Sequence, residues 1–188
     1  MSPKLDQILV IDIEATCWAG KPPTGMESEI IEIGVCPLDT TTGERLEKRS
    51  ILVRPVRSRV SEFCTRLTTL TPTQVSHGTT FRRACEILRK QYDSRTRVWA
   101  SYGDFDRRQF EYQSRSMDVP YPFGSTYINI KTLFALAYQL PHEVGLDKAL
   151  SLAGLPLEGT QHRGHDDAWN IAGLLSTMLT AMRVPKES

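Results

Sequence analysis

Cysteine is scarce in this chain, and its four cysteines lie far apart. Cys17, Cys36, Cys64 and Cys85 include no pair at the C-x-x-C spacing. That spacing is typical of structural zinc sites, and small disulfide scaffolds carry a much higher density of cysteine. The sequence therefore argues against both, and we expect reduced thiols that serve mainly in packing.

Long apolar runs are also missing. The first apolar stretch is short and is interrupted by Asp12. A secretory signal needs a longer apolar core, and a membrane helix needs about 20 apolar residues. The sequence therefore predicts neither a signal peptide nor a membrane partner, and we expect an intracellular, cytoplasmic protein.

The overall composition is that of an ordinary globular protein, with 40% hydrophobic and 24% charged residues. Its 188 residues fit one domain with one hydrophobic core and leave no room for a second. We expect a single domain over residues 1–188, with a core from about residue 6 to residue 183. The last residues, VPKES, are predicted to be a frayed tail.

A strong excess of positive charge is absent, because the formal net charge is only +1. Arginine and lysine nevertheless concentrate in two stretches, residues 45–59 and 82–97. These side chains are either the solvated faces of a strand and a helix or part of a groove that follows a phosphate backbone. The sequence leaves both interpretations open.

The chain's most informative stretch is QILVIDIEATCW, residues 7–18, which combines a β-branched apolar run with two acids. Such a run is typical of a buried central strand. Residues two apart in a strand point the same way, so Asp12 and Glu14 are expected to project together from one face. Two adjacent carboxylates repel each other unless a cation lies between them, and hard oxygen ligands suit Mg²⁺ or Mn²⁺. The alternative is that both acids simply end the strand at the solvent.

The remaining pattern alternates strands and helices. A loop rich in Gly and Pro follows Trp18, and Thr71-Pro72 has the form of a helix start. Further strands are expected over Glu29–Pro37, Arg45–Val53, Val98–Tyr102 and Tyr127–Ile130, with helices over Phe81–Tyr92, Asp104–Met117, Lys131–Gln139, Gly145–Ala153 and from about Asp166 onward.

Two more acids and a histidine stand where a metal site needs them. Asp104 follows the strand ending at Tyr102, and Asp167 lies five residues after His162, at the start of the last helix. Ligands gather at the open end of α/β sheets, so these acids could converge with Asp12 and Glu14. Four carboxylates suit two divalent cations, and a histidine on the adjoining loop suits the role of general base.

Three motifs resemble one family. IDIEAT at residues 11–16, SYGDFD at 101–106 and HRGHDDAWNIA at 162–172 are similar to the three motifs of the DEDDh superfamily of RNase H-like 3′→5′ exonucleases, and most similar to its Eri-type exoribonuclease and KapD-like branch. The resemblance implies an α/β, RNase H-like fold with a mixed five-stranded sheet flanked by helices. It also implies that Asp12, Glu14, Asp104 and Asp167 are the metal ligands for two Mg²⁺ or Mn²⁺ ions and that His162 is the general base.

Neighbouring polar residues receive other interpretations. His165 competes with His162 for the role of base, but its spacing to Asp167 does not match the family pattern, and we expect it on an exposed loop. Asp166 is interpreted as an acid that caps the last helix, and Asp106 is given a similarly local explanation. Lys131 receives either a phosphate-binding or a structural role.

The same resemblance implies how the end of the substrate is held. Backbone amides at Ala15 and Thr16 would bind the terminal 3′-hydroxyl and sugar, and Phe63 and Leu67 would bracket the last base. Aromatic faces suit this task because stacking contributes about 1 to 3 kcal/mol per base for any sequence. Two further aromatic residues are candidates for the same task, namely Trp18 and Phe105.

These expectations define one leading function and two rivals. The leading function is hydrolysis of single-stranded 3′ ends to nucleoside 5′-monophosphates, with RNA favoured over DNA. The first rival is a non-catalytic module that binds RNA ends or regulates a partner protein. The second is an oligoribonuclease that acts on very short oligonucleotides. The sequence identifies no protein partner.

Overall fold

The computed structural model describes residues 2–183, so the predicted tail at residues 184–188 lies outside the described part. A five-stranded sheet in the order β3-β2-β1-β4-β5 forms its centre. The strands are β1 (Lys4–Ala15), β2 (Ile30–Asp39), β3 (Arg49–Leu52), β4 (Arg97–Ser101) and β5 (Tyr127–Asn129). Strands β1, β2 and β3 pair antiparallel, whereas β4 and β5 join parallel, which confirms the predicted mixed sheet.

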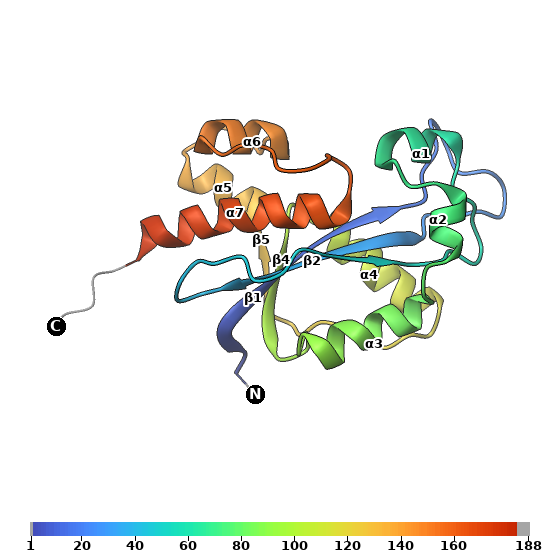
Figure 1. Cartoon of the computed structure of the whole chain (residues 1–188), viewed down its shortest axis with the longest axis horizontal. Helices are drawn as coiled ribbons and strands as arrows, with labels where there is room; N and C mark the ends of the chain where they lie inside the picture. Colours follow the sequence, from blue (N-terminus) through green and yellow to red (C-terminus); the bar gives the residue numbers. More distant parts are fainter. Residues whose placement is uncertain (1, 184–188) are drawn as a thin grey trace.

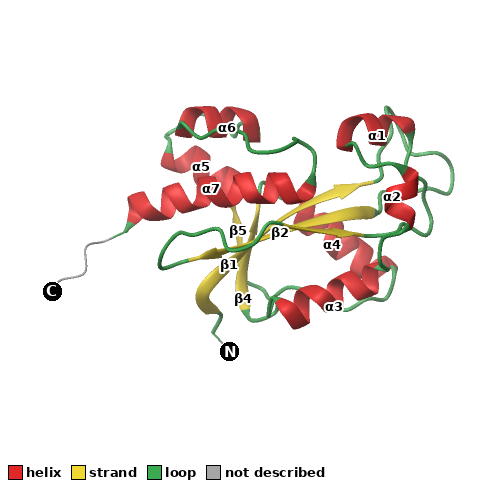
Figure 2. Ribbon diagram, in the orientation of Figure 1, coloured by secondary structure: helices red, strands yellow, loops and turns green. Residues whose placement is uncertain are grey.

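Within residues 2–183, seven helices flank the sheet (Figures 1 and 2). They are α1 (Glu62–Thr68), α2 (Pro72–Ser76), α3 (Phe81–Gln91), α4 (Phe105–Ser116), α5 (Ile130–Ala137), α6 (Leu146–Ala153) and α7 (Gly164–Met182). The predicted start of α2 is confirmed, since Thr71 and Gln74 form a reciprocal capping box there. Among these helices, none in the described residues is long and apolar enough to cross a membrane.

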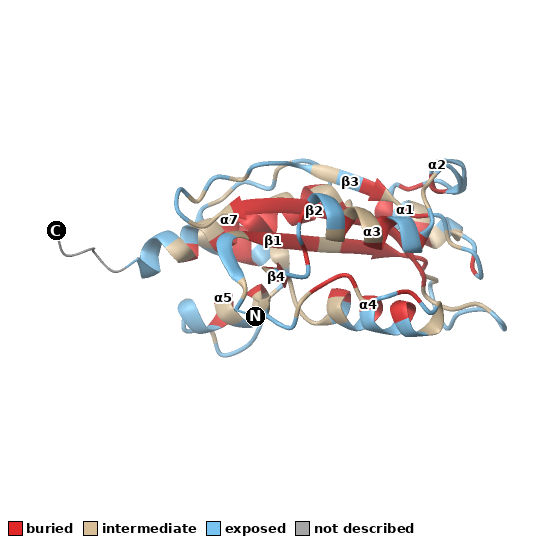
Figure 3. Cartoon of the chain, turned by 90° about the horizontal axis from the view of Figure 1, so that it is seen from below, coloured by how far each residue is buried: buried red, intermediate tan, exposed pale blue. Residues whose placement is uncertain are grey.

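The two faces of β1 are covered by different helices. Leu9 and Ile11 pack into an apolar cluster with α3 and α4, whereas Ile8 and Val10 pack with α5, α6 and α7. Figure 3 shows the sheet as the most buried layer, between helices with exposed outer faces. Because side chains alternate along a strand, Asp12 and Glu14 continue the face of Ile8 and Val10, toward α7.

Strand β3 is shorter than predicted. The sequence pattern places it at Arg45–Val53, but only Arg49–Leu52 pairs continuously with β2, and Arg45 forms an isolated bridge with Leu38. Arg45 instead stacks its guanidinium 4.1 Å from the ring centroid of Trp169 on α7. Pairing with β2 is therefore interrupted between Arg45 and Arg49 and not lost, since the Leu46 amide still donates to Pro37 O at 2.9 Å.

Candidate active site

The site forms where β1 extends beyond the end of its neighbour β4. Pairing between these strands ends at Val10 and Ala100, so the β1 edge beyond Val10 has no strand on that side. Asp106, in the first turn of α4, fills this gap, because its Oδ1 accepts a hydrogen bond of 2.9 Å from the Ile13 amide. A carboxylate thereby satisfies a backbone donor that would otherwise be buried without a partner.

Asp104 does not join the other acids, in contrast to the prediction. It is the N-cap residue of α4, and its carboxylate lies 3.3 Å from Arg107 and 4.0 Å from Arg108. The chain has already turned at Gly103, whose φ is +104°, so Asp104 no longer continues the direction of strand β4. Two positions further on, the helix directs Asp106 inward, where it is only 4% exposed.

The sequence does carry a signal for Asp106 that the local interpretation missed. Asp106, Gln109, Phe110 and Gln113 follow the i, i+3, i+4, i+7 spacing of one helix face, and all four are buried. An acid on the buried stripe of a helix needs a partner or a function. Asp106 is therefore the residue that the sequence reasoning missed, and Asp104 is the one that the structure places outside.

The start of α7 brings Asp167 and His162 to the same place. Asp167 Oδ2 accepts a hydrogen bond of 2.8 Å from the His162 amide, and His162 has a left-handed backbone with φ +62°. Such a conformation is strained for a residue with a side chain and is often found at functional sites. Candidate ligand atoms of Glu14, His162 and Asp167 all lie within 4.8 Å of one another.

Asp167 also provides a direct test of whether a cation fits. Its Oδ1 is buried and has no hydrogen-bond partner among the described residues, although Asp167 as a whole is only 6% exposed. A buried carboxylate oxygen without a donor is costly, and a divalent cation is the ligand that would satisfy it. The residues present therefore fit a metal site.

The electrostatics of the cluster agree with this geometry. Burial, with the neighbouring acids, raises the pKa of Asp12 well above its usual range and that of Glu14 to about 8. Burial likewise raises the pKa of Asp106 to about 7 and that of Asp167 to about 6. In each case the carboxylate form is disfavoured because charge is withdrawn from water and faces like charge. Bound cations would reverse that balance.

Two adjoining cavities open onto these residues. One, of about 370 Å³, is lined by all four acids of the cluster and by His162, Tyr102 and Phe105. The other, of about 360 Å³, is lined by Ala15, Thr16, Trp18, Leu67 and Phe105. Glu14 and Phe105 line both cavities, so the second lies directly beside the acidic cluster.

Most of the residues predicted to bind substrate therefore lie together, with two differences. Phe63 is half-buried in α1 and is not among the residues lining this second cavity. The Thr16 amide already donates to Glu29 O at 2.8 Å, and the Thr16 hydroxyl bonds Glu27 O and the Glu29 amide. Thr16 thus supports the local loop, and its amide is not free to bind a sugar hydroxyl.

The other predicted polar residues lie outside the cluster. His165 is half-buried in the first turn of α7, with Nδ1 3.1 Å from Glu32 Oε1, so it is not the exposed loop residue that we expected. Lys131 Nζ lies 3.9 Å from Glu143 Oε2 and does not line the cavity of the acids. Neither side chain is placed to compete with His162.

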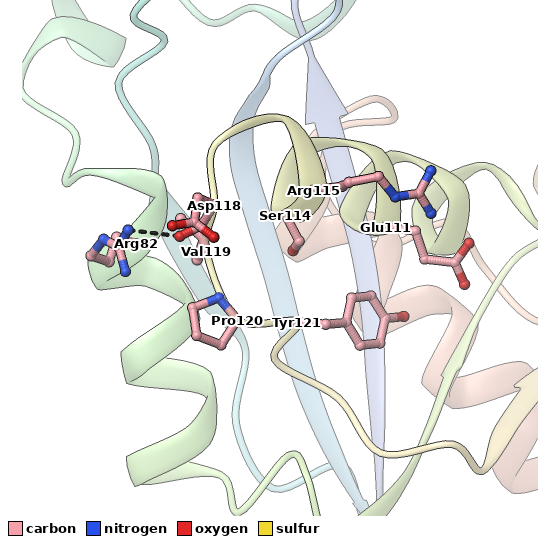
Figure 4. Close-up of a pocket in the computed structure, with 8 residues that line it drawn as sticks. All are labelled: Arg82, Glu111, Ser114, Arg115, Asp118, Val119, Pro120 and Tyr121. Atoms are coloured by element: carbon pink, nitrogen blue, oxygen red, sulfur yellow. Dashed lines mark hydrogen bonds between the residues drawn. The ribbon is translucent and has the colours of Figure 1, made fainter.

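A larger hollow, of about 630 Å³, lies elsewhere, between α4 and the segment that follows it (Figure 4). Arg82, Glu111, Ser114, Arg115, Asp118 and Tyr121 contribute to its lining. None of the predicted site residues belongs to it. Two arginines balance two acids on its walls, so its charge specifies no single class of ligand.

A mixed five-stranded sheet with a carboxylate cluster and a histidine at the end of its central strand defines the RNase H-like class of exonuclease folds. The comparison with known proteins is more specific. The chain belongs to the exonuclease family of the RNase T type, whose model matches residues 9–175.

Individual relatives confirm the resemblance to the Eri-type DEDDh branch. Human 3′-5′ exoribonuclease 1 is 33% identical in an alignment 188 positions long, which covers 93% of this chain and 52% of the human protein. The nuclease domain of 3′hExo, a DEDDh family member bound to rAMP, superposes with a TM-score of 0.86 at 30% identity and full coverage of both chains. A 3′-exonuclease recognising the 3′ end of a histone mRNA stem-loop superposes with a TM-score of 0.84 at 29% identity. The superposition covers 96% of this chain and 66% of that chain. The chain thus spans about half the length of the mammalian exoribonuclease 1 proteins that it matches.

Proposed function

We propose that this protein is a divalent-metal-dependent 3′→5′ exonuclease that releases nucleoside 5′-monophosphates from single-stranded ends. The observation that carries the proposal is the convergence of four acids and His162 on one cavity, with Asp167 Oδ1 lacking any partner among the described residues. The family match supports the same reaction class.

The proposed metal ligands are Asp12, Glu14, Asp106 and Asp167, for two Mg²⁺ or Mn²⁺ ions. Asp106 takes the place that the sequence pattern assigned to Asp104, because Asp106 lines the cavity with the other three and Asp104 does not. Divalent cations bound to such a set polarise the scissile phosphate and lower the pKa of an attacking water. The chain itself supplies charge, orientation and a place for the proton.

The proposed general base is His162. Its side chain is exposed to the cavity, and its amide is held by Asp167. Histidine is the side chain best suited to accept a proton at neutral pH. His162 would take the proton from water as the water oxygen bonds phosphorus and the 3′-oxygen of the preceding nucleotide leaves.

The proposed place for the terminal nucleotide is the cavity beside the acids. Trp18, Leu67 and Phe105 give it an apolar wall on which a base can pack without sequence preference. RNA is favoured over DNA as substrate because the relatives are named exoribonucleases and the superposed nuclease domain holds rAMP.

The four cysteines are free thiols, which supports a reducing, cytoplasmic location.

A single experiment tests this proposal. Matched 5′-labelled single-stranded RNA and DNA oligomers are digested with Mg²⁺, Mn²⁺ or EDTA, using wild type, Asp106→Asn and Asp104→Asn. We expect a metal-dependent ladder that shortens from the 3′ end, faster on RNA, absent in Asp106→Asn and retained in Asp104→Asn.

The other results are equally informative. If Asp106→Asn and Asp104→Asn both cleaved as fast as wild type, Asp106 would not be a metal ligand. RNA binding without any cleavage would favour an end-binding module. Rates that fall steeply as the oligomers lengthen would favour an oligoribonuclease for very short substrates.

A further inference from the structure

Glu32 is a buried carboxylate near the start of β2, directly opposite Glu14 of β1 in the strand register. It is 0% exposed and was not singled out by the sequence pattern. A buried charge of this kind is strongly destabilising unless it is neutralised and hydrogen-bonded. Its surroundings therefore have to supply several donors.

Those donors come from three successive residues at the start of α7. Arg163 forms a bidentate contact with Glu32, through Nε at 3.2 Å and Nη2 at 3.1 Å. The Gly164 amide donates at 2.9 Å, and His165 Nδ1 lies at 3.1 Å. Ser50 of β3 adds a hydroxyl at 2.5 Å. Burial raises the pKa of Glu32, but the bonds from Arg163 and Ser50 outweigh burial and the pKa is lowered overall.

The same turn of α7 touches the sheet at two glycines. A Cβ placed on Gly34 would lie 1.8 Å from Gly164 O, and a Cβ on Gly164 would lie 3.1 Å from Asp12 O. The glycines therefore set how closely α7 approaches β1 and β2. Further along the helix, its rotation is set by a buried apolar face that includes Ala168, Ile171 and Leu175. At the first turn, the bidentate contact between Glu32 and Arg163 adds a side-chain restraint.

The residues held by Glu32 lie between the two groups that the site needs from this segment. His162 directly precedes Arg163, and Asp167 follows His165 by two positions. The amides of Asp166 and Asp167 both donate to Arg163 O at 2.9 Å, and Asp167 in turn accepts from the His162 amide. Residues 162–167 thus form one hydrogen-bonded unit, anchored to the sheet through Arg163.

We infer that Glu32 and Arg163 are positioning residues that hold Asp167 and His162 at the distance from Glu14 needed to share a cation. This inference rests on the proposed function. Neither residue lines the cavity of the acids. Both act through the placement of the first turn of α7.

The test compares Arg163→Ala, Glu32→Gln and the double variant with wild type. Arg97→Ala is the matched control, because Arg97 forms the same bidentate contact with Asp6, at 3.1 and 2.8 Å, outside the cluster. Three quantities are measured: the Mn²⁺ dissociation constant by electron paramagnetic resonance, kcat and KM on a single-stranded RNA oligomer, and the Tm in EDTA.

We expect both single variants to bind Mn²⁺ about tenfold to a hundredfold more weakly, as is usual when the outer partner of a ligand is removed. kcat should fall by a similar factor with KM little changed, and the double variant should match the singles. Added methylguanidinium should restore Mn²⁺ binding in Arg163→Ala and have no effect on the control.

Three results distinguish the possible failures. Variants with wild-type Mn²⁺ affinity and kcat would overturn the positioning role. So would losses that only follow the unfolded fraction and do not respond to methylguanidinium. A wild-type protein that neither binds Mn²⁺ nor cleaves RNA would instead overturn the proposed function itself.

Discussion

Replacing Asp106 by asparagine should stabilise the metal-free protein at pH 8, although it removes a proposed ligand. The asparagine side chain keeps an oxygen for the Ile13 amide, whose bond to Asp106 Oδ1 is 2.9 Å long. Only the charge is lost. Burial raises the pKa of Asp106 from its ordinary value of 3.8 to about 7, so ionising this group in the folded protein costs free energy.

The sign and size of the effect follow from linkage. Between about pH 4 and pH 7 the folded state binds more protons at Asp106 than the unfolded state, so the free energy of unfolding falls as the pH rises. At about 1.4 kcal/mol per pH unit, the loss is about 4 kcal/mol once the pH exceeds about 7. This is an upper limit, because water in the cavity relieves part of it. At about 2 to 4 °C per kcal/mol, the Tm should rise by up to about 16 °C.

The assay is thermal unfolding in EDTA at pH 4.5 and pH 8. Asp106→Asn should be more stable than wild type at pH 8. At pH 4.5 most of this difference should disappear, because Asp106 of the folded wild-type protein is then largely protonated. Asp104→Asn is the control and should gain nothing, since Asp104 is half-exposed beside two arginines. An Asp106→Asn protein no more stable than wild type at pH 8 would refute the electrostatic argument.

Three further predictions concern the base, the helix contact and the substrate cavity. His162→Ala should lower kcat by about 10² to 10⁴ while Mn²⁺ affinity falls less than about tenfold, which single-turnover kinetics and Mn²⁺ titration would check; an unchanged rate at neutral pH would transfer the base elsewhere. Gly34→Ala should lower the Tm and weaken Mn²⁺ binding, because its Cβ would lie 1.8 Å from Gly164 O; a native Tm would show that α7 can shift without cost. Phe105→Ala should raise KM for RNA about tenfold with kcat less affected, in line with about 1 to 3 kcal/mol for a stacked base; an unchanged KM would remove Phe105 from the substrate wall.

Local patterns were sufficient to predict the sheet and most of its helices. The alternation of side chains in β1 placed Asp12 and Glu14 on one face, and the apolar repeat after residue 166 predicted the α7 helix. These features depend on short-range geometry, which is the same in any fold. The error at β3 arises where tertiary contacts shorten an element.

From the amino-acid sequence we predicted the mixed sheet and the family, and four of the residues that line one cavity, Asp12, Glu14, His162 and Asp167. That Asp106, and not Asp104, lies with them became visible in the folded protein. Which of the two acids points inward depends on where the chain turns between β4 and α4. Side chains two residues apart on a helix point in nearly opposite directions. The pairing of Glu32 with Arg163 was equally invisible, since 131 positions separate partners that meet only when α7 docks on β2.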